Sequence, residues 1–373
     1  MSIARVLGGP ELSLGMINTD SNHENNCLPS RQVGHDGVIV IAIVGYRNAD
    51  DVATCVAALS RAAEKNFLIS ICENGGREAY RDLIFALEKM VEPANSAPKI
   101  LDDRVADIWS GRLLQGNQRI RIYHAKSNIG YAGGVNICIR QIDPAEPWSA
   151  LWVLNPDTEP DPNALTALSA RARACDYGMV ASRMVVKSTQ RVQTYGGRWR
   201  PLMARGFNIG LDAPRDAVPD VAEIEASMMY VPGSSMFVTR EYVEGVGLLD
   251  ERYFLYCEDV DWCFRRGLRR IGYAHNSIVY HSVGTTIGSN FDPKKRSRLS
   301  VYLHERNKLL FTRRFYPAHY PLVIVTTLLL TLQYLESGAV KNFFVALSGW
   351  CAGLRGEEGL PRWFVRRLAS QEA

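Results

Sequence analysis

An uninterrupted apolar run, Val38–Val44, is the feature that most constrains the fold of this chain. Its β-branched residues follow one another without polar alternation, which is typical of a strand buried on both faces of a parallel sheet. A second such strand is predicted over 67–72, and segments with helical spacing follow both strands, over 50–65 and 80–90. Strands and helices that alternate in this way predict a doubly wound α/β fold.

The same alternation continues along the chain. Further strands are predicted over 119–124, 150–154, 180–186 and 230–238, with helices over 162–174 and 240–246, while the mixed segment 92–118 is interpreted as an insertion. Ligands of doubly wound sheets bind outside the carboxyl ends of the strands. We therefore expect the pocket to face the residues that follow the first two strands, namely Tyr46, Arg47, Asn48, Glu73 and Asn74.

Length and composition fit a folded protein with an uneven charge. The 373 residues are enough to bury a large core. Residues from 291 onward contain 13 Lys and Arg against 6 Asp and Glu, which favours an anionic partner such as a membrane surface. The eight cysteines form no CxxC pair, which favours reduced thiols in a cytoplasmic protein over a disulfide framework or a zinc site. Residues 1–34 have no sustained periodicity and no secretion signal, and are predicted to be a mobile tail.

Two carboxylates follow the strand predicted over 150–154. Asp157 and Glu159 are two residues apart, so an extended backbone would point both side chains the same way. Carboxylate oxygens are the ligands that Mg²⁺ and Mn²⁺ prefer, and these ions also bridge to substrate phosphates. The competing interpretation is the start of the helix over 162–174, to which Asp161 belongs.

Residues 128–136 contain three glycines ahead of a helix that reaches Arg140. Glycines allow a tight turn and a close approach of the backbone to a ligand. The spacing is not the GxGxxG dinucleotide fingerprint, so a purely structural turn is an equal alternative.

The segment 250–262 places three carboxylates, Glu258, Asp259 and Asp261, after an aromatic run that we expect to be buried. Burying ionised carboxylates is unfavourable unless they meet a metal, a cation or a proton to be moved, so this patch suggests chemistry. A helix N-terminus, where acids complement the helix dipole, explains the same residues equally well when the segment is taken alone.

Taken in order, these segments resemble family 2 of the glycosyltransferases and, within it, the rhamnosyltransferase-like branch. The resemblance spans residues 36–290 and depends on the combination of motifs. The motifs are Gly-Tyr-Arg-Asn at 45–48, Glu-Asn at 73–74, Asn-x-Gly-x-x-Gly-Gly-x-Asn at 128–136, Asp-Thr-Glu at 157–159, Gly-Ser-Ser at 233–235, Gly-Leu-Leu-Asp-Glu-Arg-Tyr-Phe at 247–254, Glu-Asp-Val-Asp at 258–261 and a histidine at 281. The resemblance implies a GT-A fold, an α/β architecture whose mixed, mostly parallel sheet has flanking helices. It also implies an inverting mechanism, a nucleotide-diphosphate sugar donor and Mg²⁺ or Mn²⁺.

The resemblance further implies roles for individual residues. Asp157, Glu159 and His281 would hold the metal, although Glu159 stands where Asp is commoner. Asp259 would take the proton of the acceptor hydroxyl, with Glu258 beside it. The donor would contact Tyr46, Asn48, Glu73, Asn74, Asn128, Gly130, Gly134, Asn136 and Asp157, and the acceptor would contact Gly233, Ser234, Asp261 and Trp262. Trp262 stands where Leu is commoner and is equally explained as a core residue.

Beyond the GT-A domain predicted over 35–290, residues 291–373 predict a basic, amphipathic helical region. Apolar runs lie at 322–332 and 343–354, and both are shorter than the roughly 20 residues that span a bilayer. We expect either a peripheral contact with an anionic membrane, which would suit a polyprenyl-diphosphate-linked acceptor, or packing against a second copy of the chain. The basic residues lack the interleaved aromatics of a nucleic-acid groove.

The sequence therefore predicts a cytoplasmic glycosyltransferase of cell-surface glycan assembly, peripheral on the inner face of the plasma membrane if the basic region binds lipid. The expected donor is dTDP-rhamnose or a UDP-sugar, and the expected acceptor is a saccharide, free or lipid-linked. Two alternatives stay open: a non-catalytic scaffold of the same fold that binds nucleotide sugars, and a nucleotidyltransferase.

Overall fold

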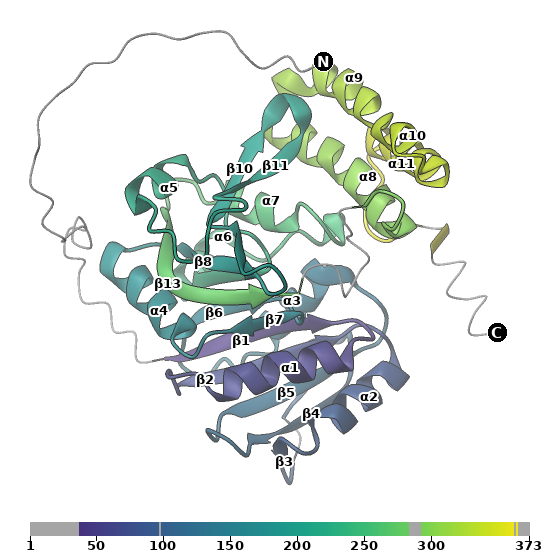
Figure 1. Ribbon diagram of the computed structural model, residues 1–373. Helices are drawn as coiled ribbons and strands as arrows, with labels where there is room; N and C mark the ends of the chain where they lie inside the picture. The colour runs from purple at the N-terminus through teal and green to yellow at the C-terminus, as the bar shows by residue number, and fades with distance from the viewer. Residues whose placement is uncertain (1–36, 97, 283–291, 362, 365–373) are drawn as a thin grey trace, which may run out of the picture.

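The computed structural model describes residues 37–96, 98–282, 292–361 and 363–364. A mixed sheet runs through the molecule in the order β3-β4-β5-β2-β1-β6-β12-β8-β13-β7, with β9 paired to β8 and a separate β10–β11 hairpin (Figure 1). The strands are β1 (Val38–Gly45), β2 (Phe67–Glu73), β3 (Val91–Pro93), β4 (Val105–Leu113), β5 (Arg119–Ala125), β6 (Trp148–Leu154), β7 (Thr158–Pro160), β8 (Met179–Val186), β9 (Arg191–Thr194), β10 (Gly196–Arg200), β11 (Arg205–Ile209), β12 (Ser235–Thr239) and β13 (Ile271–His281).

Helices cover both faces of this sheet and extend beyond it. They are α1 (Ala49–Ser60), α2 (Arg77–Leu87), α3 (Gly130–Arg140), α4 (Ala164–Cys175), α5 (Val221–Ser227), α6 (Arg240–Val246), α7 (Glu258–Phe264), α8 (Arg298–Phe315), α9 (Tyr320–Leu330), α10 (Gln333–Glu336) and α11 (Val340–Arg355), with 3₁₀ turns η1 (Pro201–Met203), η2 (Glu251–Tyr253) and η3 (Pro317–His319). The predicted α/β architecture of a mixed sheet with flanking helices is confirmed.

Strand β1 is buried on both faces, as its sequence predicts. Ile39, Ile41 and Ile43 belong to the core beneath α1, α2 and α4, whereas Val40 and Val44 belong to the core beneath α3 and α7. Full burial of one such side chain is worth about 1.5–3 kcal/mol, so this strand anchors the sheet.

The parallel pairing of the central strands creates one edge for a site. Strand β1 pairs in parallel with β2 and β6, and β2 pairs in parallel with β5. Their carboxyl ends therefore open at the same edge of the sheet. Strand β12 is antiparallel to β6 and begins at this edge, where Ser235 lies opposite Leu154.

Two expectations about chain segments were wrong. The supposed insertion at 92–118 forms most of β3 and β4, which extend the sheet at the β5 edge. The glycine-rich segment is the first turn of α3 rather than a loop ahead of it, because the helix begins at Gly130. A Cβ on Gly134 would lie 2.7 Å from the Val44 side chain, so this glycine lets α3 approach β1 closely.

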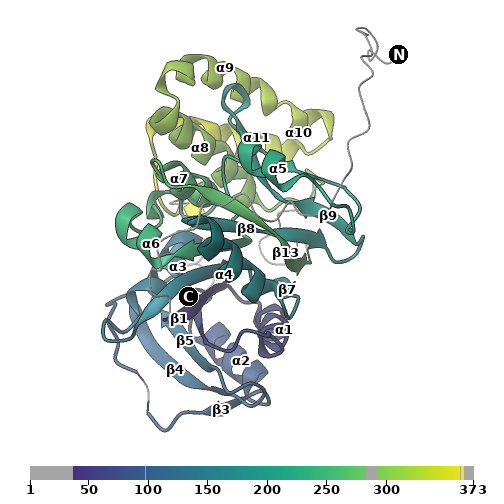
Figure 2. The same ribbon diagram turned by 90° about the vertical axis from the view of Figure 1, so that its left-hand side faces the viewer.

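The C-terminal helices pack onto the sheet domain through α8, and α9, α10 and α11 gather at the end of the molecule opposite α2 and β3 (Figures 1 and 2). Two basic residues of α8, Arg306 and Lys308, are buried, and Lys308 forms an ion pair with Glu305, whereas Arg298, Arg313 and Arg314 are exposed.

One apolar segment in the described part of the chain, Pro317–Glu336, is long enough by length and composition to cross a membrane. The prediction that the apolar run at 322–332 is too short to do so holds for that run alone, because the helical segment continues on both sides of it. Six cysteines (55, 72, 138, 257, 263 and 351) are free thiols; Cys175 is not free, so the expectation of reduced cysteines holds for those six alone.

Candidate active site

The loops after β1 and β2 are joined by the buried carboxylate of Glu73. Its Oε1 accepts hydrogen bonds from the backbone amides of Arg47 (3.1 Å) and Gly75 (2.7 Å). Its Oε2 and the Nδ2 of Asn48 are buried without a hydrogen-bond partner in the described part of the chain, and both side chains lie against Gly45. Burial raises the pKa of Glu73, against the effect of the two amides. Among the described residues, one hydrogen-bond acceptor and one hydrogen-bond donor are therefore without a partner, at the place where the sequence predicts binding of the nucleotide sugar.

The start of α3 is fastened to both β2 and the acidic segment. Asn74 donates to the carbonyl of Gly130 (2.9 Å), and Asn128 Oδ1 accepts from the Gly130 amide (3.0 Å). Gly130 has φ +77°, and a Cβ there would lie 2.3 Å from the Phe254 carbonyl oxygen, so glycine is required. Asn74 and Gly130 are thus buried beside the site, while Asn128 lies half-buried at its surface.

Tyr131, which the sequence did not single out, connects the two halves of the site. Its hydroxyl lies 3.0 Å from Asn155 Oδ1 and 2.9 Å from the Gly233 carbonyl. Burial raises its pKa well above the usual value, and the charges of Glu258, Asp259 and Asp157 add to the effect. The acids predicted as base and as metal ligand therefore surround one tyrosine.

Glu258 and Asp259 begin α7, as expected of acids at a helix N-terminus. Asp259 accepts hydrogen bonds from the backbone amides of Gly233 (2.9 Å) and Val260 (2.8 Å), and these favour its ionised form. Burial nevertheless raises the pKa of Asp259. Glu258 is buried with Oε2 unpaired in the described residues, and burial together with the charge of Asp259 raises its pKa well above the usual value. Two effects thus raise the pKa of Glu258, whereas amide hydrogen bonds oppose the rise at Asp259.

The loop that leads into this pair has an unusual backbone. Phe254, Tyr256 and Cys257 have φ of 66°, 72° and 72°, in the left-handed region that side chains rarely adopt. Asn307 of α8 holds the loop with its Nδ2, which lies 2.9, 2.7 and 2.8 Å from the carbonyl oxygens of Tyr253, Leu255 and Tyr256. The C-terminal region is thus part of the site, a contact that no local pattern in the sequence indicates.

Asp157 and His281 form the part of the predicted metal set that the structure brings together. His281 Nε2 lies 3.2 Å from Asp157 Oδ1, and its Nδ1 lies 2.7 Å from Gln193 Oε1. If Nδ1–H donates to Gln193, the lone pair of Nε2 is left for a metal, and such an orienting partner is usual for metal-bound histidine.

Glu159 does not join this pair, because it forms an ion pair with Lys187. In the described residues no group of three His, Cys, Asp or Glu gathers around one point. Of the predicted three-residue set, the structure therefore brings together two members, Asp157 and His281. These still fit a divalent ion whose other ligands come from a diphosphate and water.

Three predicted substrate contacts are structural instead. Asp261 is fully buried and bound by Arg265 (2.6 Å) and Arg314 (2.7 Å). Trp262 is fully buried, and its indole donates to the Gly247 carbonyl (2.8 Å), so the core interpretation of this residue is correct. Asn136 uses both ends of its amide on the backbone of Leu249. The two other predicted acceptor contacts also make backbone hydrogen bonds. The amide of Gly233 donates to Asp259 Oδ2, and the carbonyl of Ser234 accepts from the amide of Asn155.

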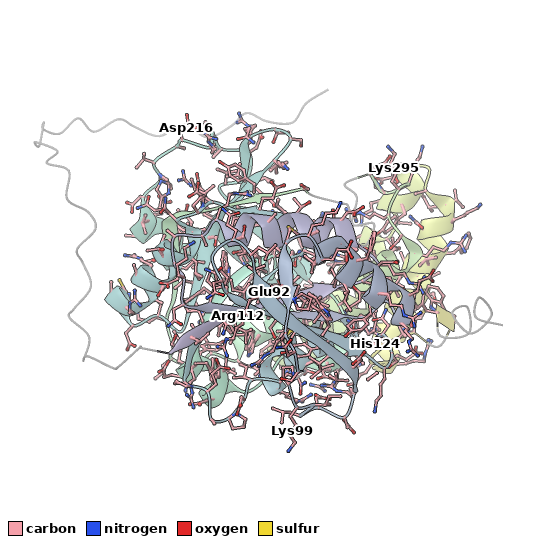
Figure 3. The ribbon with its side chains drawn as sticks, turned by 90° about the horizontal axis from the view of Figure 1, so that it is seen from below. Glu92, Lys99, Arg112, His124, Asp216 and Lys295 are labelled. Carbon is pink, nitrogen blue, oxygen red and sulfur yellow. The ribbon has the colours of Figure 1, made fainter. Side chains whose placement is uncertain are left out.

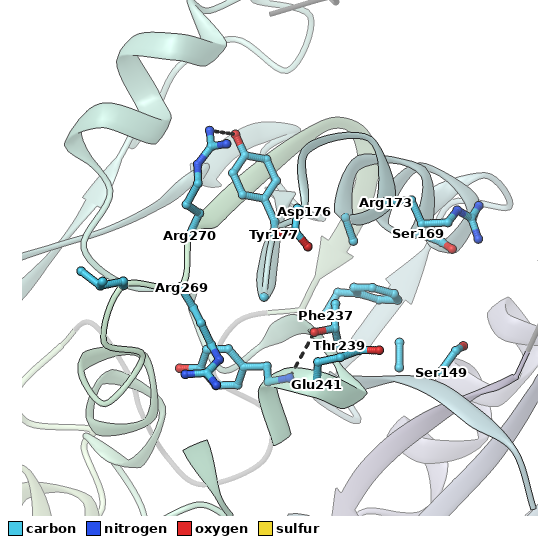
Figure 4. Close-up of a pocket in the computed structure, with 15 residues that line it drawn as sticks. Ser149, Ser169, Arg173, Asp176, Tyr177, Phe237, Thr239, Glu241, Arg269 and Arg270 are labelled. Carbon is cyan, nitrogen blue, oxygen red and sulfur yellow. Dashed lines mark hydrogen bonds between the residues drawn. The ribbon is translucent and has the colours of Figure 1, made fainter. Parts of the chain in front are cut away.

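Two cavities lie outside this cluster. One, of about 480 Å³, lies at the amino ends of β6, β8 and β13, where Arg270 donates to the Tyr177 hydroxyl (3.1 Å) (Figure 4). It contains none of the predicted site residues. The other, of about 1090 Å³, includes half-buried Tyr46 of the loop after β1 and residues of the C-terminal helices.

Comparison with known proteins finds curated relatives that are named as sugar transferases. The chain is 24% identical over 241 residues to the low-salt glycan biosynthesis hexosyltransferase Agl10 of Haloferax volcanii, covering 63% of this chain and 75% of that one. It is 29% identical over 169 residues to an N-acetylglucosaminyl-diphospho-decaprenol L-rhamnosyltransferase of Mycobacterium tuberculosis, covering 41% of this chain and only 55% of the relative. No family profile matches the chain. Among solved structures, a mannosyltransferase of Pyrobaculum calidifontis aligns with a TM-score of 0.48 at 9% identity, covering 88% and 90% of the two chains.

The chain is a glycosyltransferase. The curated relatives confirm its resemblance to family 2 and to the rhamnosyltransferase-like branch of that family, and the Haloferax relative is named for a role in glycan biosynthesis.

Proposed function

We propose that this chain moves a sugar, with inversion, from a nucleotide-diphosphate sugar to a saccharide acceptor carried on a polyprenyl diphosphate. The observation that supports it best is the position of Tyr131, which contacts the β6 edge beside Asp157 on one side and Gly233, the partner of Asp259, on the other. The residues proposed to hold the metal for the leaving diphosphate and the residue proposed as base for the acceptor are therefore linked through one side chain.

In the proposed reaction Asp259 removes the proton of an acceptor hydroxyl. The oxygen attacks the anomeric carbon from the face opposite the diphosphate, the bond from that carbon to the phosphate oxygen breaks, and the nucleoside diphosphate leaves. The backbone amides of Gly233 and Val260 favour the ionised form of Asp259 that this role requires, and a protonated Glu258 would keep a second negative charge away from it.

Asp157 and His281 would hold the divalent ion. When bound, such an ion neutralises charge on the leaving diphosphate. Gln193 orients the His281 ring through its 2.7 Å contact with Nδ1, so that Nε2 faces Asp157. Mg²⁺ and Mn²⁺ both suit one carboxylate, one imidazole and phosphate oxygens.

The unpaired atoms of the donor loop are a hydrogen-bond acceptor, Glu73 Oε2, and a hydrogen-bond donor, Asn48 Nδ2. Uracil, thymine and guanine each present an N–H beside a carbonyl that matches this pair. dTDP-rhamnose and UDP-sugars are among the donors that carry such a base. One named relative acts on a diphospho-decaprenol substrate, which supports a lipid-linked acceptor and an enzyme that works at the cytoplasmic face of a membrane.

Transfer assays with wild type and Asp259→Asn test the proposal, using dTDP-rhamnose and UDP-sugars with Mn²⁺ and reading the anomeric configuration of the product by NMR. Loss of transfer in the variant with donor binding retained is expected. Equal turnover by the two proteins would remove Asp259 as the base. Binding without turnover by wild type would favour the scaffold, and release of pyrophosphate would favour a nucleotidyltransferase.

A further inference from the structure

A basic groove of about 1090 Å³ joins the donor loop to the C-terminal helices. Tyr46 is one of its lining residues, and the others come from the segment around the start of α8, from the start of α11 and from residues 363–364. None of the described lining residues is a carboxylate, and four are cationic: Lys294, Arg296, Arg298 and Lys341. An opening that concentrates positive charge in this way attracts anions.

The same groove has an apolar side. Leu299, Val340, Trp363 and Phe364 line it beside the cations. Val340 is 52% exposed and Trp363 is 37% exposed. A simple anion such as inorganic phosphate would leave these side chains in water, so the lining fits a ligand that combines an anionic group with a hydrocarbon chain.

The groove continues into an exposed apolar face, defined as the outward side chains of α9–α11. Helix α9 packs through a stripe of fully buried residues, Val323, Thr327 and, just beyond the helix, Thr331, and Trp350 donates to Thr327 (3.1 Å). Its other side is exposed although it is equally apolar, whereas a helix that is apolar all round is normally buried. The exposed apolar face consists of Leu322, Val325, Leu328, Leu329, Leu332, Leu335, Val340 and Phe344, each between 36% and 63% exposed.

The way α9 is held indicates how this face meets a bilayer. One side of the helix is fixed to the protein along its length, so the helix lies on the molecule. An apolar face of this extent on a protein surface marks a binding surface. Lys295 is exposed at the edge of the C-terminal helices, well away from Lys99 between β3 and β4 (Figure 3), and cations next to an apolar surface suit a membrane interface.

We propose that the basic groove and the exposed apolar face together seat the lipid of the acceptor, with the cations on its diphosphate and the apolar face against its polyprenyl chain in the membrane. Val340 belongs to both surfaces, and Tyr46 belongs to both the groove and the donor loop, so the diphosphate would lie beside the donor site. This assignment rests on the proposed transfer to a lipid-linked saccharide and adds the part of the chain that holds the lipid.

Vesicle flotation of the full-length chain tests the groove. Neutral phosphatidylcholine vesicles are compared with vesicles that also contain a polyprenyl-diphosphate-linked saccharide. Arg298→Gln/Lys341→Gln should bind the second kind about 25-fold more weakly than wild type, since each cation near an anionic surface is worth about fivefold in binding. The matched control, Lys99→Gln/Arg112→Gln, removes two exposed cations elsewhere and should bind like wild type. Equal loss in both double variants, or none in either, would overturn the assignment.

The exposed apolar face is tested in the same assay. Leu329→Gln/Phe344→Gln should lose binding to both kinds of vesicle, while Leu268→Gln/Val218→Gln, which changes two exposed apolar residues away from this face, should not. If both pairs lose binding equally, the face has no special role and the proposal fails.

Kinetics separate this inference from the proposed function. Arg298→Gln/Lys341→Gln should raise the KM for the lipid-linked acceptor and leave unchanged both the donor KM and the kcat on a short saccharide without lipid. An equal defect on the short saccharide would overturn the lipid assignment. Wild type could also transfer sugar to no acceptor and still bind the diphosphate-containing vesicles more tightly than plain ones. If that binding needs Arg298 and Lys341, the groove assignment stands and the proposed function fails.

Discussion

Asn307 should be as important for turnover as the acids it never touches. It lies in α8, about fifty residues after the loop at 254–257, and its single amide group serves three carbonyls of the segment Tyr253–Tyr256. That loop ends at Glu258 and Asp259. We therefore expect Asn307→Ala to misplace the acidic pair while leaving the sheet intact.

The magnitude follows from the backbone of the loop. A left-handed conformation is unfavourable by about 1–2 kcal/mol per residue, so the three such residues store about 3–6 kcal/mol. The Asn307 amide has two N–H groups to share among the three carbonyls, and each full hydrogen bond contributes about 0.5–1.5 kcal/mol, or about 1–3 kcal/mol for two. These hydrogen bonds offset much of the unfavourable backbone energy, so without Asn307 the loop is held far less firmly in this conformation. A displacement of about 1 Å in the acidic pair would lower kcat about 100-fold.

Steady-state transfer and urea unfolding of Asn307→Ala measure both effects, with Thr312→Ala as the control. Thr312 is equally buried in α8, but its hydroxyl donates to the Lys308 carbonyl within the same helix. The control should lose stability and keep kcat. If Asn307→Ala lost about 2–4 kcal/mol of stability with kcat within a few-fold of wild type, the loop would not depend on this amide and the expectation would be wrong.

Three further predictions concern the acids and the histidine. Glu258→Gln should raise the Tm more at pH 8 than at pH 5. The raised pKa of buried Glu258 makes the wild type less stable as pH rises above 4.5, whereas Gln does not titrate. An equal gain in Tm at both pH values would contradict this. Gln193→Leu should weaken Mn²⁺ binding about 10–100-fold in an EPR titration by releasing the His281 ring, and unchanged affinity would argue against His281 as a ligand. Asp261→Asn should lower the free energy of unfolding by about 3–5 kcal/mol, since it breaks a buried ion pair, without changing the acceptor KM; a large rise in KM would return Asp261 to the acceptor site.

The donor half of the site could be predicted because it depends on the sheet. Continuous apolar runs identify β1 and β2, and parallel pairing brings their carboxyl ends to one edge, so Asn48 and Glu73 had to lie near each other. The pattern also placed Glu258 and Asp259 at a helix start. The helix-start explanation of these acids is confirmed, because α7 begins at Glu258, and their catalytic role stays a prediction.

The geometry of the predicted metal ligands and of the loop before α7 could not be predicted, because their contacts come from distant segments and from local backbone detail. Asp157 and Glu159 were expected to point the same way. Asp157 lies in a turn ahead of β7, so the alternation of side chains along a strand does not apply to it. Glu159 forms an ion pair with Lys187. Arg306 lies in the region predicted to be basic and amphipathic, yet it is buried and donates to the Tyr253 carbonyl (2.9 Å), beside Asn307. A buried arginine is tolerable only when carbonyls or carboxylates surround it. Spacing within a helix cannot reveal such partners, which here are the carbonyls of Tyr253 and Gly359 and the side chain of Asn307.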